Sequence, residues 1–151
     1  MNFVIKFNDD DVVGHTNISG YEKAVPALGG YTFGSYTFGG GPPGTGKEAK
    51  ATVHCSGVDL TIKAGPWVPS LILATYNFKR FKKIEIVELD VAQSGKPTVD
   101  AKEISTLTLS DVQVVAVDTD WGGTGSTIHV VYKHLLLSSG GKVAEFVNPE
   151  V

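Results

Sequence analysis

Leu107-Thr108-Leu109-Ser110-Asp111-Val112-Gln113-Val114 is the stretch of sequence that decides the fold. Apolar and polar residues alternate along it, which predicts a β-strand with one buried face. The two leucines lie at odd positions, however, and the two valines lie at even positions. A change of parity needs one extra residue, so the stretch predicts a β-bulge at Ser110-Asp111. A bulge bends its strand sharply, as the closure of a sheet requires.

A second change of parity occurs earlier in the chain. The apolar positions are odd up to Cys55 and even from Val58 onward, which predicts another bulge at Ser56-Gly57. Two bent strands favour a β-barrel over a flat sandwich. A strand that is buried on both faces would also break the alternation, and this alternative stays open.

The whole chain predicts a mainly β, antiparallel protein. Its 18 glycines and 7 prolines separate short runs rich in Val, Ile, Thr, Phe and Tyr, as in antiparallel sandwiches and barrels. A length of 151 residues with 42% hydrophobic content fits one domain over residues 1–151. We expect strands near residues 2–8, 14–20, 29–38, 50–63, 82–92, 101–118, 126–137 and 142–147.

One short α-helix is expected to flank the barrel. Pro69 suits the first turn of a helix that runs through Tyr76. One face of this helix carries side chains at helical spacing, which are Leu71, Ile72, Thr75 and Tyr76. We expect this face to pack on the sheet.

An extended loop is expected over about residues 29–50, where Tyr31-Thr32-Phe33-Gly34 recurs as Tyr36-Thr37-Phe38-Gly39. The segment from Gly29 through Gly46 has no charged residue. Aromatic side chains at such density usually mark a contact surface, although an ordinary core strand is the alternative. The residues expected to make the contact are Tyr31, Phe33, Tyr36 and Phe38, with Pro42 and Pro43 restricting the backbone of the loop.

A stretch within that loop, Gly41-Pro42-Pro43-Gly44-Thr45-Gly46-Lys47-Glu48, nearly matches a phosphate-binding loop. The match fails at Glu48, because the motif needs a hydroxyl there to hold Mg²⁺. The 4 histidines and the single cysteine lack the spacing of a metal site. We therefore expect no metal, no cofactor and no enzyme activity.

Charge and hydropathy exclude several kinds of partner. A net charge of −3 gives no general attraction to nucleic acid or to an anionic membrane. No apolar run is long enough to cross a membrane. The N-terminus lacks the features of a signal peptide. We expect neither nucleic-acid binding nor membrane insertion.

Taken in chain order, these features resemble the Hcp family, the haemolysin-coregulated proteins of type VI secretion systems. The resemblance covers nearly the whole chain. In the first half it consists of Gly14-His15-Thr16-Asn17, Phe33-Gly34, Gly46-Lys47, Leu60-Thr61-Ile62-Lys63 and Pro69-Ser70-Leu71. In the second half it consists of Phe81-Lys82-Lys83-Ile84-Glu85-Ile86, Gly95-Lys96, Ile104-Ser105-Thr106-Leu107-Thr108-Leu109 with Val112, the turn at 122–125, and Ile128 to Tyr132. Two departures stand out. Phe33 takes a place where members often carry tryptophan, and Pro42-Pro43-Gly44 enlarges the loop.

The resemblance implies a β-barrel subunit that forms hexameric rings. Such rings stack into a hollow inner tube, carry secreted effectors and act with sheath and spike proteins. Assembly in the bacterial cytoplasm and secretion without a signal peptide would follow. The loop between early strands reaches the next ring in this family, and residues 30–50 fall at that place.

Two other functions fit the sequence. A phage-like tail-tube protein shares the architecture implied by the resemblance. A secreted β-barrel that binds carbohydrate or another ligand would use exposed Tyr31, Tyr36 and Trp121.

Overall fold

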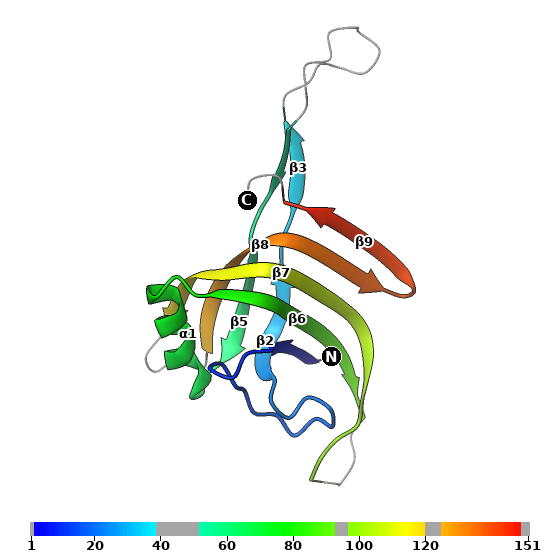
Figure 1. Ribbon diagram of the computed structural model, residues 1–151. Coiled ribbons are helices and arrows are strands. Elements are labelled where there is room, and N and C mark those ends of the chain that lie inside the picture. Colours follow the sequence, from blue (N-terminus) through cyan, green and yellow to red (C-terminus); the bar gives the residue numbers. More distant parts are fainter. Residues whose placement is uncertain (1, 39–51, 93–96, 120–124, 149–151) are drawn as a thin grey trace, which may run out of the picture.

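The computed structural model describes residues 2–38, 52–92, 97–119 and 125–148. Within these residues it is a closed antiparallel barrel of six strands with one short helix, so the expected fold class is confirmed (Figure 1). The strand order is β5-β2-β1-β6-β7-β8, and pairing of β5 with β8 closes the barrel. The elements are β1 Asn2–Lys6, β2 Val25–Thr32, β3 Ser35–Phe38, β4 Thr52–Cys55, β5 Val58–Lys63, α1 Trp67–Tyr76, β6 Arg80–Val91, β7 Ala101–Thr119, β8 Gly125–Ser139 and β9 Lys142–Val147.

The change of parity in β7 is real, but no extra residue causes it. Lys83 pairs with Ser110 and Phe81 pairs with Val112, so both strands advance by two residues across the expected bulge. The bulge expected at Ser110-Asp111 is therefore wrong. Asp111 instead has a φ of 54°, a left-handed conformation that is uncommon outside glycine.

Three neighbouring strands change parity at the same level. The buried positions on the two sides of the bend are Phe81 and Ile84 in β6, Leu109 and Val112 in β7, and Tyr132 and Leu135 in β8. Because the three strands bend together, their register is kept. In each strand, the side chains that point inward are at positions of one parity before the bend and of the other parity after it. The register shifts of β7 lie elsewhere, where Ile104 and Val115 have no directly opposite partner.

The segment expected as a strand near 14–20 is a loop. Among the described residues its one β-bridge joins Ile18 to Val99. The Thr16 hydroxyl accepts from the Ile18 N–H at 3.2 Å and donates to the Tyr21 carbonyl at 2.6 Å. Such local side-chain bonds compete with a sheet ladder. The loop covers a second apolar cluster outside the barrel wall, which contains Val4, Ile18, Ala24, Val87 and Leu89.

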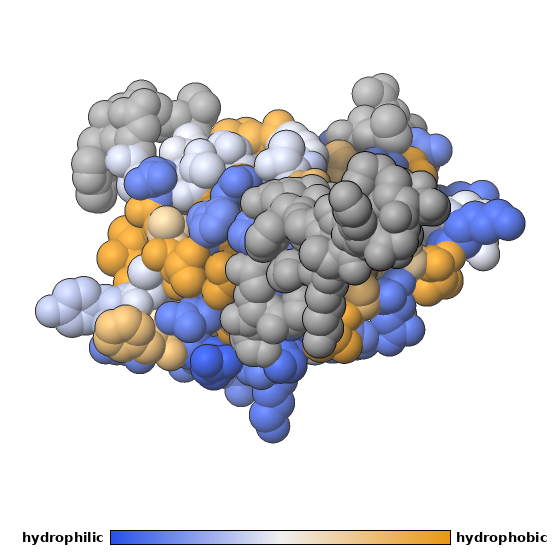
Figure 2. All heavy atoms as spheres, turned by 90° about the horizontal axis from the view of Figure 1, so that it is seen from above, coloured by the Kyte–Doolittle hydropathy of each residue, from blue (hydrophilic) through white to orange (hydrophobic). Residues whose placement is uncertain are grey.

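Helix α1 packs beside β7 with a different face from the expected one. Its buried residues are Trp67, Val68, Leu71 and Ala74. Ile72, Leu73 and Tyr76 are exposed instead, so the expected packing face is wrong for Ile72 and Tyr76. Seen from above, hydrophobic side chains reach the surface on the left and on the right of the molecule, where Figure 1 places α1 and β9 (Figure 2).

The hairpin that joins β8 to β9 has a tight turn at 138–141. Ser139 pairs with Lys142, and the two residues between them are glycines with φ values of 58° and 79°. Positive φ at both central positions is the requirement of a type I′ turn. β9 lies at the outer end of the strand order, next to β8.

Candidate functional site

The strands β3 and β4 form a hairpin that projects beyond the barrel (Figure 1). Ser35 pairs with Cys55 and Phe38 pairs with Thr52, so the two strands are in register along their length. β3 follows β2 after two residues, and β4 precedes β5 by two residues. The hairpin is thus a continuation of two barrel strands past the rim. The single strands expected over 29–38 and 50–63 are each divided in two.

Gly34 and Ser56 hold the two sides of the hairpin together at its base. The Ser56 N–H donates to the Gly34 carbonyl at 2.8 Å, and the Gly34 N–H donates to Ser56 Oγ at 2.7 Å. Ser56 Oγ also donates to the Gly34 carbonyl at 3.0 Å. Instead of the bulge expected at Ser56-Gly57, these two residues separate β4 from β5, where the chain leaves the hairpin and enters the barrel.

Gly57 lets β8 pass close to the base of the hairpin. A Cβ atom at this position would lie 2.6 Å from the Val130 carbonyl oxygen and 2.8 Å from the His129 ring. Both distances are shorter than van der Waals contact, so another residue would push β5 away from β8. Glycine is needed here for the close approach of the backbones, not for an unusual φ.

Three aromatic rings lie at the barrel rim below the hairpin. Phe3 meets Tyr31 edge to face with centroids 5.9 Å apart, and Tyr31 stacks on Phe33 at 5.9 Å. All three are partly buried and pack against the main core. Burial and the negative charge of Glu88 raise the pKa of Tyr31 above its usual value, against a hydrogen bond with Ser105 that lowers it. Tyr31 and Phe33 are therefore built into the rim of the barrel.

The six residues expected to make a contact are thus divided. Tyr31 and Phe33 lie at the base and are half-buried. Tyr36 and Phe38 lie in β3, opposite His54 and Thr52. Pro42 and Pro43 lie outside the described residues.

The sequence did not reveal Phe3 as part of the base, nor the contacts that Ser56 and Gly57 make there. The alternation of Phe3 with Ile5 gave a signal for an inward ring, since both lie on one face of β1. Ser56 and Gly57 were recognised as an irregular position, but their hydrogen-bond partner and the approach of β8 depend on distant parts of the chain.

A cluster of charged side chains, separate from the hairpin, lies at the end of α1. Lys79 Nζ contacts Asp9 Oδ1 at 2.9 Å and Asp11 Oδ2 at 2.6 Å. Partial burial opposes ionisation of Asp9, but the hydrogen bonds from Lys79 and from the Asp11 N–H, together with the charge of Lys79, outweigh it and lower the pKa of Asp9. The hydrogen bonds to Asp11 and Asp9 raise the pKa of Lys79. Both aspartates are paired with the same lysine, an arrangement that joins the loop at 7–24 to the helix end.

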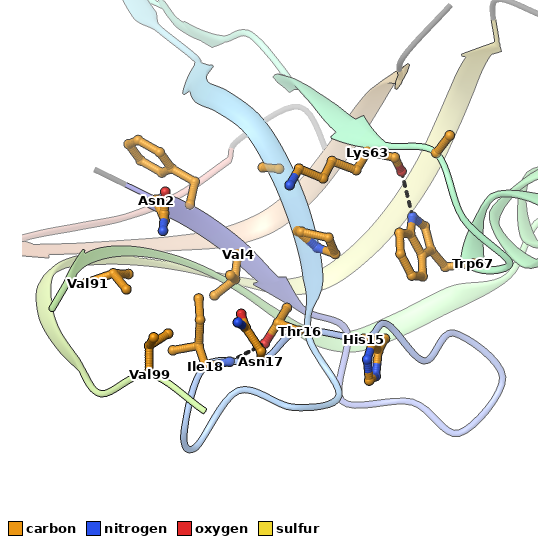
Figure 3. A pocket seen from close by; sticks show the side chains of 14 residues that line it. Asn2, Val4, His15, Thr16, Asn17, Ile18, Lys63, Trp67, Val91 and Val99 are labelled. Carbon is orange, nitrogen blue, oxygen red and sulfur yellow. Dashed lines mark hydrogen bonds between the residues drawn. The ribbon is translucent and has the colours of Figure 1, made fainter. Parts of the chain in front are cut away.

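A cavity of about 590 Å³ opens between that loop, β1 and β2 (Figure 3). Val4, Ile18 and Val99 give it apolar walls. His15 and Lys63 belong to its lining, and the Lys63 carbonyl accepts from the Trp67 indole at 2.8 Å. Its polar side chains converge on no common point, so we assign it no ligand.

Comparisons with known proteins place the fold. No family model and no curated protein sequence matches the chain. Solved structures do match. A variant of the Hcp1 protein from E. coli EAEC 042 pathovar is 16% identical with a TM-score of 0.69, over 97% of this chain and 96% of that one. The chain has the Hcp fold.

Two further structures extend the Hcp likeness. Secreted protein Hcp3 from Pseudomonas aeruginosa is 16% identical with a TM-score of 0.66, covering 97% of each chain. A type VI secretion system effector from Yersinia pestis is 16% identical with a TM-score of 0.67, over 96% of this chain and 98% of that one. The Hcp fold therefore accounts for the barrel, α1 and β9 together. Among the described residues no helix has the length and apolarity that a membrane crossing needs.

Proposed function

We propose that this chain is a structural subunit of the inner tube of a type VI secretion system. The observation that carries the proposal is the Hcp fold over 97% of the chain. The resemblance read from the sequence and the likeness of the fold are separate lines of support, since the identities of 10–19% are too low for one to imply the other.

The subunit forms hexameric rings, and the rings stack into a hollow tube. The β3–β4 hairpin is the element suited to join one ring to the next, because it extends past the rim as a continuation of two barrel strands. Its base is held by the Gly34–Ser56 bonds and by the rings of Tyr31 and Phe33. A braced base fixes the direction in which the hairpin points, which a contact between rings requires.

The same proposal includes the partners and the location. The tube carries secreted effectors and meets sheath and spike proteins, and it is assembled in the bacterial cytoplasm before secretion without a signal peptide. The role is structural, with no catalytic step and no cofactor. The pairing of Asp9 and Asp11 with Lys79 supports this in one respect, because it uses the carboxylates that a cation site would need.

The placement of Tyr31 and Phe33 decides how the proposal is tested. Serine at either position would remove rings that pack on the core and would disturb the barrel itself. The variants to use are Tyr36→Ser and Phe38→Ser in β3, with Thr37→Ser in the same strand as the matched control.

The measurement is electron microscopy of the purified protein together with sedimentation velocity. We expect hexameric rings in all variants, stacked tubes in the wild type and the control, and loss of tubes and secretion with Tyr36→Ser and Phe38→Ser. A wild-type protein that stays monomeric over a wide concentration range contradicts the tube and favours a ligand-binding barrel. Tubes that persist in both variants place the ring-to-ring contact elsewhere.

A further inference from the structure

Helix α1 ends in a turn that normally needs glycine. The Phe78 N–H donates to the Thr75 carbonyl at 3.3 Å, and the Lys79 N–H donates to the Ala74 carbonyl at 2.9 Å. These two bonds define a Schellman motif, in which the residue after the C-cap takes a left-handed conformation. That residue is Phe78, with a φ of 55°. Glycine is usual there because it has no Cβ to crowd the backbone.

Phe78 buries little apolar surface within the described part of the subunit that could offset this strain. A left-handed conformation costs a residue with a Cβ about 1–2 kcal/mol. The Phe78 side chain is 77% exposed, so it buries little apolar surface in return. A strained backbone under an exposed ring is an arrangement that serves a contact outside the chain.

Phe78 does not stand alone. Three neighbours on the outer side of α1 are exposed as well, and together they form what we call the helix-end patch, made up of Ile72, Leu73, Tyr76 and Phe78. Tyr76 is 82% exposed. The two aromatic rings alone present an area on the order of 300 Å², which brings the patch to the size that marks functional surfaces on monomers.

A second apolar surface lies at β9. This strand pairs with β8 and, within the described residues, with no other strand, so its outer edge carries main-chain groups without a strand partner. Val143 and Val147 lie on one face of β9 and are 63% and 57% exposed. We call these two valines and the open edge the β9 patch. An open edge with apolar side chains is a site for association with another chain.

We propose that the helix-end patch of one copy docks on the β9 patch of the next copy. The two patches lie on opposite sides of the barrel, so one chain cannot bring its own patches together (Figures 1 and 2). Contact between different patches of identical chains is head-to-tail, and such contacts close into rings when the rotation allows. Tyr76 suits a strand edge because its ring is apolar while its hydroxyl can bond to unpaired main-chain groups.

The area supports a second copy as the occupant. A standard interface buries about 800 Å² on each partner, and the helix-end patch supplies about half of this from four side chains. The open edge of β9 supplies directed hydrogen bonds that a flat apolar surface lacks. The inference rests on the proposed ring assembly and names the surfaces that close the ring.

The first experiment uses Phe78→Gly, which changes folding and assembly in opposite directions. Glycine relieves the left-handed strain, so the melting temperature of the dissociated subunit should equal or exceed that of the wild type. Loss of the exposed ring should weaken ring formation at least tenfold in sedimentation. Leu28→Ser is the matched control, since Leu28 is 44% exposed on β2 and belongs to neither patch; rings of this variant should form as in the wild type.

The second experiment tests proximity directly. Phe78→Cys protein is mixed with Val143→Cys protein under mild oxidation, and we expect covalent dimers that contain one copy of each. Phe78→Cys mixed with Leu28→Cys should give none, and neither should the wild type, whose Cys55 is buried.

The outcomes separate the two proposals. A wild type that forms no ring contradicts the proposed function, and this inference with it. Wild-type rings that persist in Phe78→Gly, without the mixed disulfide, overturn this inference alone. Loss of rings accompanied by a lower melting temperature in Phe78→Gly would assign Phe78 to the fold, and overturns the inference unless the mixed disulfide forms.

Discussion

Ser56 and Gly34 are joined by three hydrogen bonds at the place where the barrel strands become the hairpin, two of them through the Ser56 hydroxyl. This pair couples the direction of β3 and β4 to the barrel. The Ser56 hydroxyl accepts one of these hydrogen bonds and donates another. A side chain without a group that can do both would lose at least one of them. The orientation of the hairpin thus depends on one small polar residue.

Ser56→Ala should loosen the hairpin and leave the barrel intact. The change removes both side-chain bonds and leaves the Gly34 N–H without its acceptor, at a cost of about 1 kcal/mol. Amide hydrogen exchange should speed up in β3 and β4 while the amides of β6 to β8 keep their protection. Ser138→Ala on β8 is the control and should leave the exchange of the hairpin unchanged. Equal exchange in both variants would mean that the main-chain bond alone holds the base.

Gly57→Ala should destabilise the barrel at its closing seam. The added methyl would stand 2.6 Å from the Val130 carbonyl oxygen, and neither backbone can move without breaking the pairing of Val58 with Val130. Crowding of this kind costs about 1–3 kcal/mol. Chemical denaturation provides the measurement. Gly29→Ala is the matched control, because nothing lies within 4 Å of a Cβ built there.

Lys79→Met should lower the free energy of unfolding by about 1 kcal/mol at neutral pH, as expected for a partly exposed ion pair. Methionine removes the charge that faces Asp9 and Asp11 and that also lies 5.5 Å from the centroid of the Phe81 ring. The pKa of Asp9 is lowered in the folded protein, so its stabilisation is present above the ordinary value of 3.8 and is lost as pH falls through the folded-state pKa.

The difference between the wild type and Lys79→Met should therefore be constant from neutral pH down to about 3.8 and shrink below it. Lys82→Met, at an exposed position of β6, controls for the loss of one positive charge. A difference that does not change with pH would assign the effect to packing.

Tyr132→Phe should reduce the loss of stability in alkaline solution. Burial and the neighbouring Cys55 thiol raise the pKa of Tyr132 to about 12. Between its ordinary value of 10 and about 12 the unfolded chain releases this proton while the folded protein holds it, so stability falls as pH rises. Phenylalanine has no proton to release and should show a smaller decline. Thermal unfolding from pH 8 to 11 checks this, and an identical decline in both proteins would contradict it.

The regular part of the fold could be predicted because it is local. Alternation identified β6, β7, β8 and β9 within about two residues, and the pair Gly140-Gly141 fixed the last turn. The parity changes identified bending correctly. They could not reveal its cause, because a bend shared by three strands and a bulge in one strand leave the same pattern in a single sequence.

Other features depend on distant contacts and were missed for that reason. Ile104 and Val115 are β-branched and apolar, as strand residues should be, yet each is the unpaired residue at a register shift. In α1 nearly every residue is apolar, so the sequence contained two possible faces and the barrel buried the one with Trp67 and Ala74. The rim site was predicted only in part, since the burial of Tyr31 requires Phe3 from the first strand.

The continuity of the hairpin with β5 has a mechanical consequence. β5 closes the barrel by six consecutive pairs with β8, from Val58–Val130 to Lys63–Gly125. A pull on the hairpin along its length is transmitted through Cys55 and Gly57 into this seam and acts parallel to the strands. Hydrogen bonds loaded in that direction share the tension and must break together, whereas bonds pulled open from one end break one after another. A tube driven forward by force at its ring contacts would thus load each subunit along its strongest direction.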